Sequence, residues 1–203
     1  MSGLTLALST ASPALSLALF DGDARIAHDH RTIGRGHAEA LMPAVAAMLA
    51  GRAPPVHVLV DIGPGSFTGI RIGIAAARAL GLAWGVPVNG FSGAGLVAAR
   101  AFAERPELTH VGVLLDAGRG QLLFGEFERD LALPAMHIMA ASDVPGNVAL
   151  AGAGTALLAD AMSRDIVHAG LPDAAYALGL PLAARDLLPN AHYLRPPDAI
   201  LPL

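Results

Sequence analysis

The chain has 203 residues, with 54% hydrophobic and 15% charged side chains, a formal net charge of -4, no cysteine, and 13 basic residues that are all arginine. The absence of lysine excludes P-loop, kinase-type and Schiff-base chemistry, and the absence of cysteine excludes thiolate nucleophiles, iron–sulfur clusters, thiolate zinc sites and disulfides. So apolar a composition predicts a folded chain with a large core, and the negative charge argues against an independent nucleic-acid binder, which needs a cationic face.

We expect a cytoplasmic protein that makes no contact with a membrane. The N-terminal residues Met1–Leu4 lack the basic segment that opens a secretory signal. Arg78 interrupts the longest mostly apolar stretch, residues 72–88, so this stretch does not predict a membrane span.

The first hundred residues alternate between strand-like and helix-like patterns. Apolar runs bounded by Gly, Pro, Asp and Ser predict strands, and apolar residues at spacings of three and four predict amphipathic helices. The strands are expected at 4–9, 14–20, 25–31, 56–60 and 86–88, and the helices at 37–49, 67–84 and 92–102.

A polar segment with a proline, residues 103–109, predicts a domain boundary. Beyond it, strands at 111–115 and 121–127 flank a turn and repeat the strand–turn–strand order of the opening segment. This repetition indicates two related domains, 1–104 and 105–203, in an α/β protein. A strand at 148–151, a helix at 155–162 and an irregular proline-rich tail at 189–203 are expected to follow.

The glycine-rich segment Gly63–Gly73 allows two interpretations. Glycines beside a helix N-terminus expose N–H groups that can bind phosphate, but the spacing fits neither a dinucleotide fingerprint nor a P-loop. The pattern therefore favours a turn and packing role over phosphate binding. The candidate nucleotide- or phosphate-binding residues are Gly63, Gly65, Ser66, Thr68, Asp116, Gly152 and Gly154.

No catalytic or metal site is evident from the residues alone. His28 and His30 place two imidazoles on one face of a predicted strand, but a catalytic zinc ion needs three protein ligands, so a solvated strand face is favoured. Ser66 lies in Pro-Gly-Ser-Phe-Thr-Gly rather than in G-x-S-x-G, which argues against a nucleophile elbow.

The segment Gly63–Gly73 matches, at every position, the signature G-P-G-S-F-T-G-[LI]-R-[IV]-G of the bacterial TsaB proteins, also called YeaZ. Residues 6–19, 37–43, 115–119 and 193–195 also resemble segments of this family, so the resemblance covers nearly the whole chain. It implies two actin-like (ASKHA), RNase H-like domains with mixed sheets flanked by helices.

The resemblance also implies a role in making threonylcarbamoyladenosine at the adenosine beside the tRNA anticodon. In that pathway TsaB pairs with its paralogue, the transferase TsaD, or with a second TsaB when TsaD is absent, and the ATPase TsaE joins through the TsaB–TsaD pair. We expect tRNA to be bound only by the complex. The isolated chain is expected to bind no cofactor, with ATP or ADP placed at the interface with TsaD. The alternative is a metal-dependent, glycoprotease-like peptidase of the same superfamily.

The chain departs from the pattern of its relatives at positions that carry chemistry. The two metal-binding histidines of TsaD-like proteins would fall on Gly93 and Val97, and Ser9 stands where the family usually has an aspartate. The resemblance therefore implies a non-catalytic subunit.

The two helices expected on either side of the strand at 56–60 carry more apolar and small residues than one stripe facing a sheet requires. Exposed apolar patches usually mark interfaces, so the surplus predicts a partner surface. We expect Gly73→Glu to abolish pairing and leave the monomer folded. The expected interface residues are Leu41, Met42, Val45, Met48, Gly69, Ile70, Gly73, Ile74 and Ala77.

Overall fold

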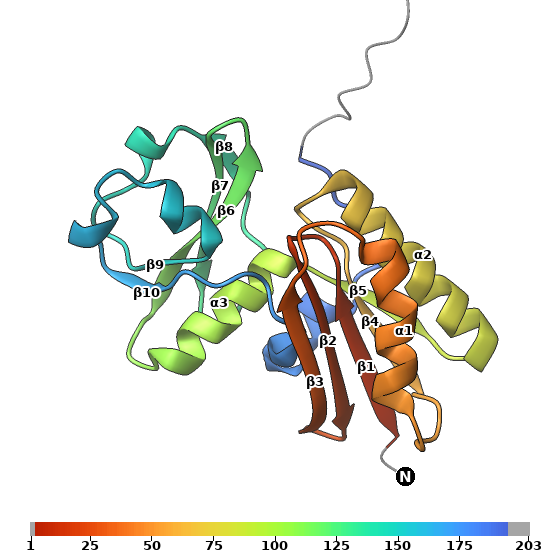
Figure 1. Ribbon diagram of the computed structural model, residues 1–203. Helices are drawn as coiled ribbons and strands as arrows, with labels where there is room; N and C mark the ends of the chain where they lie inside the picture. The colour runs from red at the N-terminus through yellow and green to blue at the C-terminus, as the bar shows by residue number, and fades with distance from the viewer. Residues whose placement is uncertain (1–2, 195–203) are drawn as a thin grey trace, which may run out of the picture.

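The computed structural model describes residues 3–194, which form two five-stranded mixed sheets with helices around and between them (Figure 1). The first sheet has the order β3-β2-β1-β4-β5. Strands β3, β2 and β1 are antiparallel neighbours, and β1, β4 and β5 are parallel neighbours. Its strands are β1 Leu4–Ser9, β2 Ala14–Asp21, β3 Ala24–Thr32, β4 His57–Asp61 and β5 Val88–Phe91.

The second sheet repeats this arrangement in a smaller form, with the order β10-β9-β6-β7-β8. An antiparallel hairpin, β6–β7, again opens the unit, and β6 pairs in parallel with the later strand β9. The predicted α/β fold with two related mixed sheets is therefore confirmed. Its strands are β6 His110–Gly118, β7 Gln121–Glu128, β8 His137–Met139, β9 Leu150–Ala151 and β10 Ile166–His168.

Three long helices take different positions around the first sheet. Helices α1 (His37–Leu49) and α2 (Phe67–Trp84) lie side by side on one face of the sheet, with the bounds that their periodicity predicts (Figure 1). Helix α3 (Gly93–Glu104) lies between the two sheets and is buried on nearly all sides, as expected for a helix that is apolar all round.

One hydrophobic cluster extends through both halves of the molecule. It includes Ala7 and Leu59 of the first sheet, Val113 and Leu123 of the second, and Val97 of α3 between them, all at most 5% exposed. A second cluster lies beneath α1 and α2, and a third covers the other face of the second sheet. The helix α3 thus joins the two halves through a shared core.

Three predicted elements differ from the structure, and the strand expected at 148–151 is limited to Leu150–Ala151. The strand expected at 86–88 lies at Val88–Phe91, because α2 closes through Gly85 at positive φ and the N–H of Val86 donates to the carbonyl of Gly81. The helix expected at 155–162 is two 3-10 turns, η2 (Ala153–Leu157) and η3 (Ala161–Ser163). Between them, Leu158 takes an extended conformation and inserts into the third cluster, which breaks the helix.

The last part of the described chain returns to the first sheet. The 3-10 turn η4 (Ala174–Gly179) packs against β1, β2 and β3, and the short helix α4 (Leu182–Arg185) against β5. The N–H of His192 then donates to the carbonyl of Ile62, at 2.8 Å. The described part of the predicted tail is irregular, and the rest lies outside the described residues. Within residues 3–194, no helix combines the length and apolar character needed to cross a membrane.

Candidate functional site

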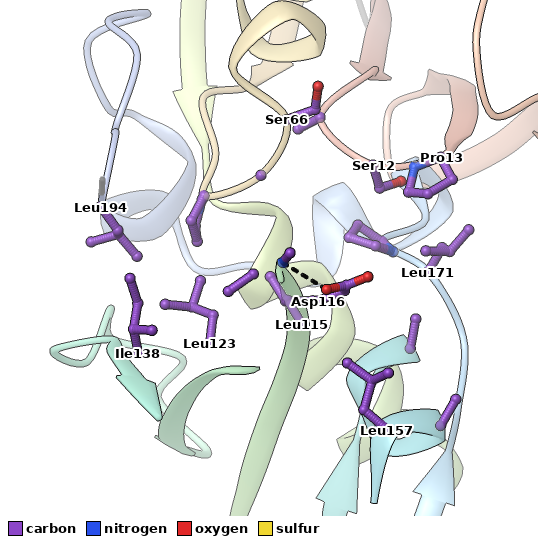
Figure 2. A pocket seen from close by; sticks show the side chains of 18 residues that line it. Ser12, Pro13, Ser66, Leu115, Asp116, Leu123, Ile138, Leu157, Leu171 and Leu194 are labelled. Atoms are coloured by element: carbon purple, nitrogen blue, oxygen red, sulfur yellow. Dashed lines mark hydrogen bonds between the residues drawn. The ribbon is translucent and has the colours of Figure 1, made fainter. Parts of the chain in front are cut away.

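A cleft of about 550 Å³ opens between the two halves of the molecule (Figure 2). The first half lines it with the turn after β1, residues 11–13, and the loop before α2, residues 64–66. The second half lines it with the end of β6, residues 115–118, and with side chains from β7, β8 and η2. A cleft between two halves of a chain is a common place for a ligand or a partner group.

The lining of this cleft is mostly apolar. Figure 2 shows Leu115, Leu123, Ile138 and Leu157 around the opening, and Asp116 is the single charged side chain among the described lining residues. Its Oδ1 accepts a hydrogen bond from the N–H of Gly118, at 2.7 Å. Phosphate groups are bound by cationic side chains, by metal ions or by the N–H groups at a helix N-terminus. The described lining offers no cationic side chain for a nucleotide phosphate chain, and Gly65 and Ser66 at the start of α2 are its only residues at the N-terminus of a long helix.

The glycine-rich loop is packed against the first hairpin. The N–H of Ser66 donates to the carbonyl of Ala11 at 2.7 Å, and the hydroxyl of Thr10 donates to the carbonyl of Gly69 at 2.7 Å. A Cβ at Gly65 would clash with the carbonyl of Ala11, and one at Gly69 with the carbonyl of Thr10. The glycines are thus explained by the close approach of two backbones, which favours the packing interpretation.

The structure separates the seven candidate nucleotide- or phosphate-binding residues. Gly65, Ser66 and Asp116 line the cleft, whereas Gly63 and Thr68 do not. Gly152, at φ 107°, and Gly154 pack closely against Leu114 of β6, on either side of Ala153, which lines the cleft. They let the backbone approach Leu114, and their phosphate-binding role stays a prediction.

Asp61, at the end of β4, is a buried carboxylate that the sequence reasoning passed over. Its side chain accepts from the hydroxyl of Ser9 at 2.7 Å and from the N–H groups of Gly63 and Gly93, both at 2.9 Å. It therefore connects β1, the glycine-rich loop and the N-terminus of α3. Burial raises the pKa of Asp61 to about 6, although these three hydrogen bonds act to lower it. A polar residue that ends an apolar strand just before a glycine-rich loop was the available signal.

Asp61 is expected to make the fold less stable as pH rises from about 4 to 6. Its pKa is about 6 in the folded chain and about 3.9 when unfolded, so in this window the folded state holds a proton that the unfolded state has released. Its contribution to the free energy of unfolding is fully present below the unfolded pKa and is lost as pH rises through the folded pKa. Urea unfolding at a series of pH values measures this, and Asp61→Asn should remove the Asp61 contribution. A variant profile parallel to that of the native chain would contradict this assignment.

Three comparisons with known proteins each find a match that covers most of the chain. A family model described as "TsaD: tRNA N6-adenosine threonylcarbamoyltransferase" matches residues 30–173. A protein of Mycobacterium tuberculosis (strain H37Rv) is 32% identical over 206 residues, covering 96% of this chain and 92% of its own length. The solved structure "YeaZ from Pseudomonas aeruginosa" superposes with a TM-score of 0.73 at 25% identity, covering 89% of this chain and 90% of that chain.

The chain belongs to the TsaB (YeaZ) family. Escherichia coli (strain K12) has a member, "tRNA threonylcarbamoyladenosine biosynthesis protein TsaB", that is 34% identical over 132 residues, covering 62% of this chain and 55% of its own length. The resemblance carried by Gly63–Gly73 is therefore confirmed, and the family is linked to the biosynthesis of threonylcarbamoyladenosine.

In this TsaB-family chain, Gly93 and Val97 stand where the resemblance would place the two metal-binding histidines of TsaD-like proteins. Gly93 begins α3 directly over Asp61, and a Cβ built on it would lie 2.5 Å from Asp61 Oδ2. Val97 is 1% exposed and packs within the cluster shared by the two sheets. Both positions belong to the closed interior of the molecule.

The predicted partner surface needs correction, because eight of its nine residues face the first sheet. Met42 alone is exposed, at 45%. The row of small residues in α2 brings the helix close to the sheet, since Gly73 packs against Thr10, Leu8 and Val60. The buried residues are Leu41, Val45, Met48, Gly69, Ile70, Gly73, Ile74 and Ala77.

Proposed function

We propose that this chain is a non-catalytic subunit that pairs with TsaD and supports the attachment of threonylcarbamoyl to tRNA. The observation that carries the proposal is the closed interior at Gly93 and Val97, where the resemblance would place the two metal-binding histidines of TsaD-like proteins. An imidazole at position 93 would collide with Asp61, and one at position 97 would overfill the core between the sheets.

The environment of Ser9 supports the same proposal. The family usually has an aspartate at this position, whereas here the Ser9 side chain is fully buried and donates its hydroxyl proton to Asp61. A second carboxylate beside the buried Asp61 would place two like charges together, which is costly. We therefore propose that the local polar groups hold the loop and α3 in place and carry out no chemistry.

The charge distribution supports a role within a complex. The chain has a net charge of -4, and the described lining of the cleft offers no cationic side chain. Binding of tRNA would thus depend on TsaD, and ATP or ADP at the interface would need cations supplied by the partner. We keep TsaE as a further partner that joins through the TsaB–TsaD pair.

We place the partner surface on the outer face of α1 and α2. This face carries exposed small and apolar side chains at steps of three or four, which allow another backbone or side chain to approach closely. TsaD would occupy it in the complex, and a second copy of this chain in its absence. The exposed residues are Ala38, Met42 and Ala46 of α1 and Ala75, Ala79, Leu82 and Ala83 of α2.

Reconstitution with the cognate TsaD, TsaE, tRNA, ATP and a threonylcarbamoyl donor tests the proposed function. We expect transfer by TsaD to rise when the chain is added, and we expect no transfer and no peptide cleavage by the chain alone, with or without zinc or iron. Chelator-sensitive turnover by the purified chain would support the peptidase alternative. Full TsaD activity without the chain would contradict the supporting role.

Ala79→Arg is expected to weaken pairing with TsaD roughly tenfold or more, because a long charged side chain would hold the two surfaces apart. The folded chain should tolerate the change, since Ala79 faces solvent. Binding is measured by titration calorimetry, and thermal unfolding checks the fold. Ala103→Arg, at an exposed position of α3, is the matched control and should bind normally. Equal affinity for Ala79→Arg and Ala103→Arg would exclude this face.

A further inference from the structure

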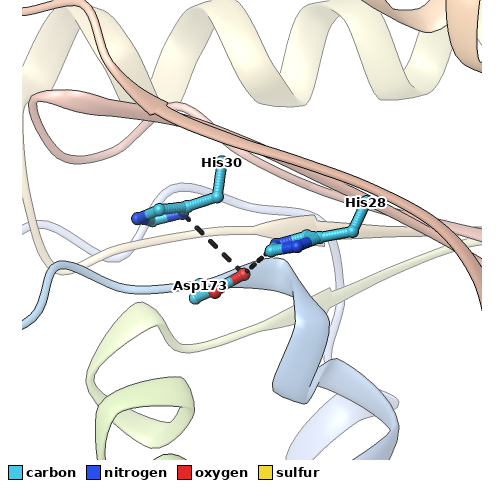
Figure 3. A group of neighbouring side chains, drawn as sticks. All are labelled: His28, His30 and Asp173. Atoms are coloured by element: carbon cyan, nitrogen blue, oxygen red, sulfur yellow. Dashed lines mark hydrogen bonds and ion pairs between the residues drawn. The ribbon is translucent and has the colours of Figure 1, made fainter.

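Two imidazoles and a carboxylate that lie far apart in the sequence meet beside the first sheet (Figure 3). His28 and His30 share one face of β3, and Asp173 immediately precedes η4. His28 Nε2 lies 2.8 Å from Asp173 Oδ1, and His30 Nδ1 lies 3.8 Å from the same oxygen. One ligand atom from each side chain falls within 4.8 Å of the others.

We propose that His28, His30 and Asp173 bind a divalent transition-metal ion of the Zn²⁺ class. Imidazole nitrogen and carboxylate oxygen are donors that Zn²⁺ prefers, at bond lengths of about 2.0–2.2 Å. Ligand atoms around a tetrahedral ion at such distances lie about 3.3 Å apart. The separations from Asp173 Oδ1, 2.8 Å and 3.8 Å, lie on either side of that value, so small shifts of the side chains would bring both nitrogens to it. A solvent molecule or a partner's donor would take the fourth position.

The carboxylate of Asp173 is held in place by the packed structure around it. Its Oδ1 accepts from the N–H of Ala175 at 2.9 Å and from the hydroxyl of Ser16 at 3.2 Å. The same hydroxyl lies 3.0 Å from His30 Nδ1 and accepts from the N–H of Ala174 at 2.9 Å. The bonds from Ala175 and Ser16 orient the carboxylate, as hydrogen bonds to ligating carboxylates do in known metal sites. The contact of Ser16 with His30 engages the nitrogen that faces Asp173, so a bound ion would replace it.

The exposure of the three side chains gives an ion a route to the carboxylate. The side chain of Asp173 is only 12% exposed, whereas that of His28 is 31% exposed. An ion would thus reach the carboxylate from the His28 side.

A hydrogen bond that only stabilises the fold would need only one of the two histidines. The His28–Asp173 contact already connects β3 to η4. The second imidazole stacks beside the first, with ring centroids 6.1 Å apart and an angle of 20° between the planes. Protonation of both rings would place two positive charges side by side, whereas a bound cation uses both neutral rings. An ion here would link the edge strand of the first sheet to the segment that returns from the second.

The experiment is a titration of the chelator-treated full chain with Zn²⁺, and with Co²⁺ as a spectroscopic probe, at a pH where histidine is neutral. We expect one ion per chain, visible Co²⁺ absorption and a higher Tm with metal. His28→Gln and Asp173→Asn should each bind at least about tenfold more weakly. His137→Gln, which removes an exposed histidine from β8, is the matched control and should bind as the native chain does.

The outcomes separate a metal site from a structural bond. Absence of Co²⁺ absorption and of a Zn²⁺-dependent Tm shift in the native chain would overturn the proposal. Equal Zn²⁺ binding by His28→Gln, His137→Gln and the native chain would also overturn it, because the ion would then sit elsewhere. Circular dichroism without metal shows that each variant is folded. None of these measurements depends on pairing with TsaD, so they can fail while the proposed function stands.

Discussion

Replacing Gly73 with glutamate is expected to destabilise the fold strongly, in contrast to the prediction from the sequence that only pairing would be lost. A Cβ at this position would lie 2.7 Å from Thr10 Oγ1 and 3.5 Å from Leu8 and Val60 side-chain carbons. The rest of the side chain would push α2 away from the sheet and bury an unpaired carboxylate. Overpacking and an unpaired buried charge are among the mechanisms that cost about 4 kcal/mol or more.

Urea unfolding followed by circular dichroism measures this loss. Ala75→Glu is the matched control, because it adds the same side chain on the exposed side of the same helix and should change stability by less than about 0.5 kcal/mol. If Gly73→Glu proved as stable as Ala75→Glu, the close packing of α2 on the sheet would be wrong.

Asp61→Leu is expected to lower the free energy of unfolding by about 3 kcal/mol or more. Leucine has nearly the same shape but accepts no hydrogen bonds, so the hydroxyl of Ser9 and the N–H groups of Gly63 and Gly93 would lose their partner. Each buried donor left unpaired costs about 1–3 kcal/mol. The glycine-rich loop and the N-terminus of α3 would then lose their common anchor.

Asp61→Asn distinguishes lost hydrogen bonds from lost charge. The amide oxygen can still accept from Gly63 and Gly93, and the amide nitrogen can donate to Ser9 Oγ, so the network survives with a different direction at one bond. We expect this variant to retain most of the native stability at pH 7, measured by the same urea titration. A loss equal to that of Asp61→Leu would show that the negative charge itself is required.

The sequence predicted α1 and α2 well because their boundaries are marked locally. Gly36 precedes α1 at positive φ, Ser66 accepts from Gly69 as the N-cap of α2, and Gly85 closes α2 in the left-handed conformation. The repeated hairpins were equally readable from apolar runs and turns. The segment 155–162 misled because its helical spacing is overridden by one leucine that inserts into the core.

The orientation of α2 could not be read from its period. The helix carries two rows of small residues at steps of four, one through Gly69, Gly73 and Ala77 and one through Ala75 and Ala79. Only the first faces the sheet, and this follows from the position of Thr10 and Val60 in space. When small residues lie on two faces of a helix, the sequence pattern does not indicate which face is buried.

The polar groups around Asp61 and around Asp173 depend on contacts between residues far apart in the sequence, which local spacing does not reveal. Asp61 meets Ser9 across 52 residues, and Asp173 meets His28 across 145. The glycine-rich motif did locate one wall of the cleft, because its residue types are unusual in themselves. Asp173, the proposed third metal ligand beside His28 and His30, reaches them because the chain returns to the first sheet.

The shared core around α3 makes the molecule mechanically stiff. In many two-lobed proteins the lobes rotate about a hinge and close on a ligand. Such a rotation here would separate α3 from one of the sheets and expose the apolar side chains between them, at about 25 cal/mol for each Å². The segment that carries η4 and α4 packs against the first sheet and also opposes this rotation. The cleft should therefore hold its width, and any partner must fit the opening as it stands.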